Sequence, residues 1–444
     1  MSKIFIFLFV ASISVWLMSC VAFDARAERR AERGTLEISK SDNSELHDRI
    51  QGYLARQQVA NFSFGVWQNG QLVTEGDYGS TSPANPEPVS DTTIYRIQSM
   101  TKPITAVGFL ILLERGHFSL SDPITKFLPE FKTTETLADY DEAGTLYTYR
   151  PPNPPTMEQL LSHTSGLAYW QTSGGIIDQR ILAAGLAQSR DTDSLVRALA
   201  EYPYIAMPGS EWNYSFASDM QGAIIERITG QSLASFLELE VFQPLGMTDT
   251  GFHVPAHNGQ RISAETSFSS SRFEYVPSEP STLTEQSKIY FEGGHGLYST
   301  RRDYLKFLDA LRGNGANGAA RILSAETLEK LKTNAIKHRG APGPRRSYGV
   351  QAGLSFGLGV GLIEDPLIAN LAAPKGTYYW QGALGTFFWV DPVNDLVFVS
   401  MLQSQTKLEP DLMANAMDAI YGDTYLQESD AQTPKPPQAS DGSG

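Results

Sequence analysis

Two β-hairpin patterns lie near opposite ends of the 444-residue sequence, and they constrain the fold more than any other feature. In the first, alternating runs at 62–67 and 71–73 flank Asn69-Gly70, a pair that strongly favours a two-residue hairpin turn. In the second, apolar runs at 386–390 and 396–401 flank a turn rich in Asp, Pro and Asn. Because an isolated hairpin is only marginally stable, strands at both ends predict one antiparallel sheet that joins the two ends of the chain.

The region between the hairpins has a different pattern. Roughly residues 121–286 contain mainly helix patterns and proline-rich loops, and a further helix pattern follows the second hairpin at 409–421. We therefore expect an α/β (α+β) sandwich, in which an antiparallel sheet is flanked by helices and carries an inserted, mostly helical subdomain. The folded domain should span residues 45–425, a length sufficient for a large core.

The first residues resemble a targeting sequence, a signal peptide or lipoprotein signal at 1–27, because Lys3 precedes an apolar run at 4–23. Ala25-Arg26-Ala27 fits cleavage by ordinary signal peptidase, whereas Leu17-Met18-Ser19-Cys20 resembles a lipoprotein signal. An uncleaved membrane anchor is a third alternative. All three predict a folded part outside the cytoplasm, in the periplasm, and a lipidated Cys20 would hold it at a membrane.

Polar segments flank the predicted domain. Residues 28–44 are charged and polar, which is typical of a tether. Residues 426–444 are rich in Ser, Pro, Gly, Gln and Asp without an apolar face, so we expect a disordered tail.

Composition excludes several classes of ligand. The formal net charge of −14 argues against a nucleic-acid partner, whose binding requires clustered Lys and Arg. Cys20 is the only cysteine, so it has no disulfide partner and no companion for a metal. The seven histidines show no H-x-x-x-H or H-E-x-x-H spacing, and we expect neither a metal nor a cofactor.

The sequence Ser99-Met100-Thr101-Lys102 suggests nucleophilic chemistry. Residues three apart share a helix face, with Cβ atoms about 5–6 Å apart, so the Lys102 amine can reach the Ser99 hydroxyl. An amine beside a serine is one way to activate a nucleophile without histidine. The same spacing also occurs by chance on ordinary helix surfaces.

The residues after Lys102 favour the catalytic interpretation. Residues 103–115 are apolar nearly all round, which predicts a buried helix, and Gly116 supplies its stop. Pro103 is tolerated only in the first turn of a helix, so the helix must begin close to Ser99. An oxyanion forming beside Ser99 would then meet free N–H groups at a helix N-terminus, and burial would lower the pKa of Lys102 toward neutrality.

Two later segments carry further candidate residues. Tyr214 lies on a loop that leads into a helix pattern, where a half-buried structural role is the alternative. Trp380-Gln381-Gly382-Ala383 opens the second hairpin, and Gly382 there allows close approach of a ligand to the backbone. A glycine-loosened strand is the alternative interpretation of this segment.

In order and spacing, these three segments resemble the S-x-x-K, Y-x-N and K-T-G boxes of the serine β-lactamase and penicillin-binding-protein superfamily, in its class C-like branch. Supporting segments at 161–167, 244–247 and 296–300 are similar to that branch, and the resemblance covers roughly residues 50–421. It implies a β-lactamase/transpeptidase-like fold, with the active site between the sheet and the helical subdomain. His163 lies in one of the supporting segments and is interpreted as structural.

The resemblance implies a role for each site residue. Ser99 would be the acylated nucleophile, Lys102 would take its proton, and Tyr214 would be the second proton-transfer residue. The N–H groups of Ser99 and Ala383 would form the oxyanion hole.

Two departures from the family boxes bear on the substrate. Phe216 stands where β-lactamases and peptidases have an asparagine that binds the substrate amide, and Trp380 replaces a lysine that helps to hold the substrate carboxylate. We predict that Trp380, Gly382 and Phe216 contact substrate in an apolar, neutral site that suits uncharged esters. This pattern most closely resembles the family VIII carboxylesterases.

Gly353-Leu354-Ser355-Phe356-Gly357 matches a different motif, the G-x-S-x-G elbow of α/β-hydrolases. That elbow needs a helix directly after the serine, and a later acid and histidine. The residues that follow Ser355 are too glycine-rich for a helix, and the last histidine, His338, precedes it. We therefore reject Ser355 as the nucleophile.

Three functional hypotheses follow. The first is a serine carboxylesterase acting on small ester substrates, with activity highest for short acyl chains because aromatics such as Tyr169, Trp170 and Tyr298 narrow the cleft. The second is a β-lactamase or D-Ala-D-Ala carboxypeptidase. The third is a non-catalytic envelope protein that binds a ligand or a partner through a relict active site.

Overall fold

The computed structural model describes residues 44–55, 59–82, 86–170, 175–269, 272–276, 290–313, 316–317, 320–336, 350–405 and 412–422. The predicted signal sequence with Cys20 and Ala27, the predicted tether apart from its last residue, Ser44, and the predicted tail lie outside these ranges. Within these ranges, no helix is both long enough and apolar enough to span a membrane.

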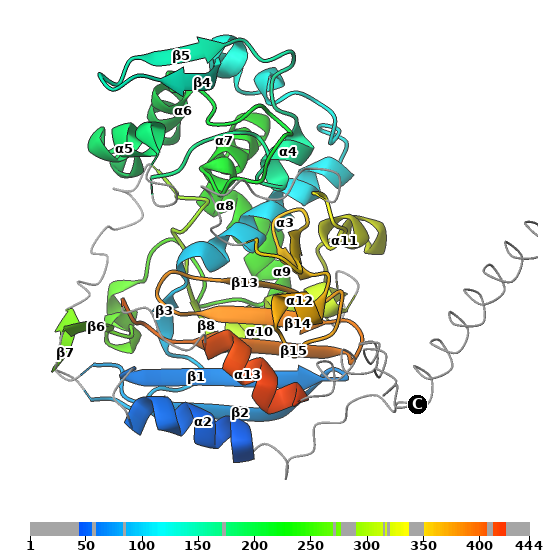
Figure 1. The fold of residues 1–444 in the computed structure, drawn as a ribbon. Helices are drawn as coiled ribbons and strands as arrows, with labels where there is room; N and C mark the ends of the chain where they lie inside the picture. The colour runs from blue at the N-terminus through cyan, green and yellow to red at the C-terminus, as the bar shows by residue number, and fades with distance from the viewer. Residues whose placement is uncertain are drawn as a thin grey trace, which may run out of the picture. The chain divides into compact units, whose positions relative to one another are not determined.

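A seven-stranded antiparallel sheet joins the two ends of the domain, as the hairpin patterns predicted (Figure 1). Its strands follow the order β11-β12-β13-β14-β15-β1-β2. Their bounds are β1 Asn61–Gln68, β2 Gln71–Gly79, β11 Leu354–Phe356, β12 Gly361–Ile363, β13 Tyr378–Gln381, β14 Phe387–Asp391 and β15 Leu396–Met401. The pairing of β1 with β15, which sets Ser63 opposite Met401, brings the first hairpin and the C-terminal strands into one sheet.

Both predicted hairpin turns are confirmed. Asn69 and Gly70 have φ values of 53° and 75°, the left-handed conformations that a tight two-residue turn requires. In the turn between β14 and β15, the Asp391 carboxylate accepts hydrogen bonds from the backbone N–H groups of Val393 (2.8 Å) and Asn394 (3.2 Å). Short-range turn chemistry therefore fixes the register of both hairpins.

Helices cover both faces of the sheet. Helices α2 (Ser44–Ala55) and α13 (Leu412–Tyr421) lie on one face, and α10 (Arg301–Arg312) lies on the other (Figure 1). The indole N–H of Trp389 donates to the Tyr421 hydroxyl (3.0 Å), which fastens α13 to the sheet. On the other face, Gly65 lets α10 approach closely, since a Cβ there would stand 3.0 Å from Leu305 Cδ1.

The central part of the chain forms the helical region, and it contains more strand than the sequence pattern indicated. Its helices are α4 Met157–Leu161, α5 Ile176–Ala183, α6 Thr192–Ala200, α7 Ala217–Thr229, α8 Leu233–Leu237 and α9 Gln243–Leu245. Two hairpins accompany them, β4 Thr136–Tyr140 with β5 Leu146–Tyr149, and β6 Glu265–Ser269 with β7 Arg272–Val276. The remaining short elements are β9 Ala316–Asn317, β10 Ala320–Arg321, α11 Ala325–Leu331 and α12 Pro366–Ala369.

Helix α3 (Thr101–Glu114) runs through the core between the helical region and the sheet (Figure 1). Its residues from Thr101 to Leu112 are all buried, which explains why its sequence is apolar on every side. Gly108 allows α8 to pack against it, since a Cβ there would lie 2.7 Å from a methyl group of Leu237. Gly116, with φ of 75°, follows the helix end as predicted.

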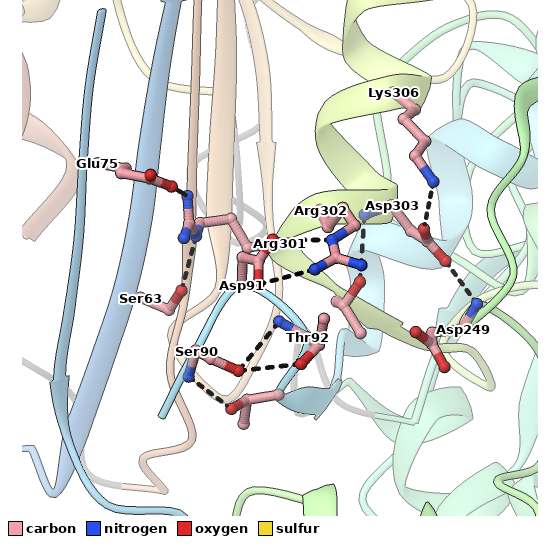
Figure 2. Close-up of polar contacts among 12 residues, drawn as sticks. Ser63, Glu75, Ser90, Asp91, Thr92, Asp249, Arg301, Arg302, Asp303 and Lys306 are labelled. Atoms are coloured by element: carbon pink, nitrogen blue, oxygen red, sulfur yellow. Dashed lines mark hydrogen bonds and ion pairs between the residues drawn. The ribbon is translucent and has the colours of Figure 1, made fainter. Parts of the chain in front are cut away.

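A buried arginine ties α10 to the sheet. Arg301 is 2% exposed, and Figure 2 shows its guanidinium between Ser63 of β1 and Glu75 of β2. Its Nε donates to the Ser63 hydroxyl (2.9 Å), and its terminal nitrogens bind the carboxylates of Glu75 and Asp77 (2.9 Å to Asp77). Burial raises the pKa of Asp77, and the nearby arginine charge opposes this rise. By contrast, the next residue, Arg302, pairs with Asp91 at the surface.

Candidate active site

Ser99 lies in a tight turn between the two parts of the fold. Strand β3 (Ile94–Arg96), paired with β8 (Tyr298–Thr300), leads into one 3-10 turn, Gln98–Met100, and α3 begins at Thr101. The α-helix thus starts two residues later than Ser99. Gln98 has φ of 49°, a left-handed conformation that is unfavourable for a non-glycine residue and is frequent beside catalytic groups. The Ser99 side chain is half-buried, so a substrate can reach it.

Lys102 projects from the first turn of α3 toward Ser99. Its Nζ donates to Ser99 Oγ (3.2 Å) and to the carbonyl oxygen of Gly294 (2.7 Å), and the residue is only 2% exposed. Burial lowers the pKa of Lys102 to about 7, while the Asp219 carboxylate acts in the opposite direction. An amine with this pKa is partly neutral near neutral pH, so it can accept the serine proton.

Tyr214 and other aromatic residues enclose Lys102. The ammonium nitrogen lies 4.5 Å from the ring centre of Tyr214 and 5.4 Å from that of Tyr169, distances typical of cation–π contacts. Trp380 lies against Tyr214 with ring centres 5.7 Å apart. Phe216 is fully buried just before α7, and its ring meets Tyr169 edge-on at 5.0 Å. The structure therefore brings the two predicted proton-transfer residues, Lys102 and Tyr214, together inside a low-dielectric, aromatic environment.

His163 supports the loop that carries Tyr214. Its ring lies 5.0 Å from that of Tyr214, its Nδ1 is 3.1 Å from the Ser215 hydroxyl, and its carbonyl accepts from Asn213 N–H (2.8 Å). Burial lowers the pKa of His163 to about 3, so the imidazole is neutral at ordinary pH. These contacts agree with the structural interpretation of His163.

The predicted oxyanion turn lies beside the residues that precede Ser99. A Cβ on Gly382 would come within 2.4 Å of the Ile97 carbonyl oxygen, and the Thr386 hydroxyl donates to the same oxygen (3.3 Å). Only glycine permits this contact between the end of β13 and the turn that contains Ser99. Ala383 follows as an exposed residue in the turn.

Residues 293–297 form a support for Ser99 and Lys102 that the motifs did not reveal. Leu297 exchanges hydrogen bonds with the residues on either side of the Ser99 turn, donating to Thr101 Oγ1 (3.2 Å) and accepting from Ile97 N–H (3.1 Å). The Thr105 hydroxyl donates to the Gly293 carbonyl (2.8 Å), one residue before the carbonyl that binds Lys102. The glycine cluster Gly293-Gly294-His295-Gly296 is the sequence signal that could have indicated this close packing.

Two other residues singled out in the sequence have different surroundings. Ser355 is in strand β11, is 3% exposed, and leads into β12 without an intervening helix, so the α/β-hydrolase elbow is absent. Tyr298, which was expected to narrow the cleft, packs with Ile94 and Ile262 in a small separate cluster, because its strand pairs with β3. Trp170 does lie close, with its ring 5.9 Å from that of Tyr169.

Residues 46–422 match the sequence family described as Beta-lactamase. The chain belongs to the β-lactamase family. Esterase EstB of Burkholderia gladioli is 32% identical to this family member over 374 residues, which cover 80% of this chain and 89% of EstB. Lovastatin esterase of Penicillium rubens is 26% identical over 354 residues, covering 75% and 85%.

A solved structure shares the fold of this β-lactamase-family protein. EstCE1, described as a hydrolase with promiscuous acyltransferase activity, superposes with a TM-score of 0.69 at 23% identity. The match covers 86% of this chain and 99% of EstCE1. The expected β-lactamase/transpeptidase-like fold is confirmed.

Proposed function

We propose that this protein is a serine carboxylesterase that forms an acyl-enzyme at Ser99. The observation that carries the proposal is the buried Lys102 amine, 3.2 Å from the accessible Ser99 hydroxyl and surrounded by neutral aromatic rings. Membership of the β-lactamase family and the similarity to EstB and lovastatin esterase support a serine hydrolase of this kind.

The geometry supports a two-step reaction. In acylation, Ser99 Oγ attacks the ester carbonyl carbon while the Lys102 amine takes the hydroxyl proton. The N–H groups of Ser99 and Ala383 stabilise the oxyanion of the tetrahedral intermediate. The carbon–oxygen bond to the alcohol then breaks, and the proton passes to the departing alkoxide through Lys102 and Tyr214. In the second step, water gives a proton to the same base while its oxygen attacks the carbonyl carbon of the acyl-enzyme. The bond from that carbon to Ser99 Oγ then breaks, the base returns the proton to Ser99, and the acid leaves.

The surroundings of Ser99 favour an uncharged substrate. Trp380 is 5% exposed and presents an apolar ring with one N–H donor, where the family box has a lysine for a carboxylate. Phe216 offers no amide to bind a peptide or β-lactam. Losing a charged hydrogen bond to a carboxylate costs about 1.5–3 kcal/mol, so charged substrates should bind poorly.

A graded ester screen tests this proposal. We expect kcat/KM for p-nitrophenyl esters to peak at about two to six acyl carbons, because packed rings such as Tyr169 limit the length of chain that the site can enclose without exposing apolar surface to water. Nitrocefin, assayed in parallel, should be hydrolysed far less efficiently than the best ester. Efficiency that rises steadily to long-chain esters would disprove the short-chain specificity, and nitrocefin turnover equal to the best ester would favour a β-lactamase instead.

We also propose that the enzyme acts outside the cytoplasm, on the support of the signal-like residues 1–27 alone. Mass spectrometry of the mature N-terminus from cell fractions tests this. A start at Cys20 with a lipid adduct in the membrane fraction indicates an anchored lipoprotein, whereas a start at residue 28 in the soluble periplasm indicates cleavage after Ala27. A full-length chain in the cytoplasm would refute the proposed location.

A further inference from the structure

A buried carboxylate lies directly behind the proposed general base. Asp219, in the first turn of α7, is 2% exposed. Its Oδ1 accepts hydrogen bonds from the Tyr290 hydroxyl (2.8 Å) and from the Gly294 N–H (3.3 Å). Asp219 does not match any of the family boxes, and the reaction steps described above do not use it.

Gly294 connects Asp219 to Lys102. Its N–H binds the carboxylate, and its carbonyl accepts the hydrogen bond from Lys102 Nζ (2.7 Å). A Cβ on Gly294 would stand 2.8 Å from Asp219 Oδ2 and 3.4 Å from Lys102 Nζ. Gly294 therefore lies between the Asp219 carboxylate and the Lys102 amine, in a space too small for a larger residue. Neighbouring Gly293 is equally confined, since a Cβ there would lie 2.5 Å from the Ser218 carbonyl oxygen.

The second carboxylate oxygen faces the same space. Asp219 Oδ2 is buried and accepts no hydrogen bond from the part of the chain that the structure describes. An isolated buried carboxylate is costly, and an opposite charge within several ångströms offsets that cost. Lys102, on the other side of Gly294, provides this charge when it is protonated.

We propose that Asp219 is a positioning residue for Lys102. Through Gly294 it fixes the carbonyl that aims the lysine at Ser99, and its negative charge favours the protonated form of the lysine, so it helps to set the fraction of Lys102 that is neutral and able to accept the Ser99 proton. This inference rests on the proposed function, in which neutral Lys102 accepts the Ser99 proton.

The other groups that face Lys102 do not provide a negative charge that could raise the pKa of the lysine. Burial raises the pKa of Tyr169 well above its ordinary value and lowers that of His163 to about 3, so both side chains are neutral near pH 7. Tyr214 contributes the face of its ring. Tyr290 donates a hydrogen bond to Asp219. Burial raises the pKa of Tyr290, and the negative charge of Glu292 raises it further. The negative charge on Asp219 is therefore the contribution to test.

The pH dependence of acylation separates this role from a merely structural one. The wild-type protein and the variants Asp219→Asn and Tyr290→Phe are compared by kcat/KM for p-nitrophenyl acetate and by the rate at which a fluorophosphonate probe labels Ser99. Asp219→Asn keeps an oxygen for the Gly294 N–H but loses the charge, whereas Tyr290→Phe removes a hydrogen bond from the same carboxylate and leaves the charge. In the wild type, both rates should fall below about pH 7, where Lys102 becomes protonated.

In Asp219→Asn the acid limb should move to lower pH by about one unit, because a nearby negative charge no longer favours the protonated lysine. The variant should then retain a larger share of its maximal rate at pH 6 than the wild type does. Tyr290→Phe should keep its inflection near that of the wild type, even if its maximal rate falls.

An unchanged inflection in Asp219→Asn, with only a lower rate, would overturn the inference and leave Asp219 a packing residue. If Asp219→Asn does not fold, Asp219→Ser can be used as the variant that has no charge at this position. The rate of Ser99 labelling is then compared, because only folded molecules react with the probe. Absence of wild-type labelling at Ser99 across the pH range would instead refute the nucleophile, and would identify the failure as that of the proposed function.

Discussion

Ser99→Ala should reduce the hydrolysis of p-nitrophenyl acetate by about 10⁴-fold or more, since removal of a covalent nucleophile eliminates the acyl-enzyme route. Ser355→Ala should leave kcat/KM within about twofold of the wild-type value, because Ser355 lies in strand β11 and has no role in the proposed reaction. Steady-state kinetics of both purified variants provide the measurement.

The two serines form a matched pair, since both substitutions remove one hydroxyl oxygen. Thermal unfolding should show that both variants are folded, so that a difference in rate reports chemistry. The reverse outcome, an active Ser99→Ala and an inactive Ser355→Ala, would contradict the nucleophile. Full activity in both variants would place the reaction at a different site in the molecule.

Arg301→Met should lower the free energy of unfolding by about 3 kcal/mol, which is the lower end of the range for breaking a buried ion pair. The variant leaves Asp77, 26% exposed, without its cation, while Glu75, 47% exposed, can turn to water. This partial exposure of the carboxylates is the reason for choosing the lower value. Urea unfolding followed by tryptophan fluorescence would measure the loss.

The adjacent residue provides the control. Arg302 is 51% exposed, and its partner Asp91, which faces it in Figure 2, is 36% exposed. Arg302→Met should therefore cost less than about 1 kcal/mol. Equal losses in the two variants would show that burial of the guanidinium does not determine the contribution of this network.

Features that depend on neighbouring residues could be predicted from the sequence. The Asn69-Gly70 turn and the terminal hairpins follow from local turn chemistry and alternation, and the S-x-x-K spacing places Lys102 near Ser99 without reference to the rest of the fold. Pro103 limited the start of α3 to within a few residues. Even there, the 3-10 turn at Ser99 was not foreseen, because it depends on tertiary contacts such as the hydrogen bond from Tyr304 to the Met100 carbonyl (2.9 Å).

Features that depend on distant contacts were missed. Asp219 contacts Gly294 because α7 packs against α3 and residues 290–297 lie against both helices. No local sequence pattern indicates this arrangement. Tyr298 was expected, with Tyr169 and Trp170, to narrow the cleft, but it packs with Ile94 and Ile262. The β4–β5 hairpin was overlooked although its turn has local signals, a left-handed Gly144 and an Asp141 carboxylate that accepts from the Thr145 N–H.

The strand order also determines when the site can form during synthesis. Strand β15, the last strand of the described residues, lies between β14 and β1 in the interior of the sheet. Until it leaves the ribosome, the first hairpin and the strands β11–β14 have no shared partner, and each presents an open edge. Joining residues as distant as Ser63 and Met401 closes a very long loop, which makes this step slow. Because β13 and its Ala383 turn belong to the second group, a nascent chain carries Ser99 long before it can complete the proposed oxyanion hole.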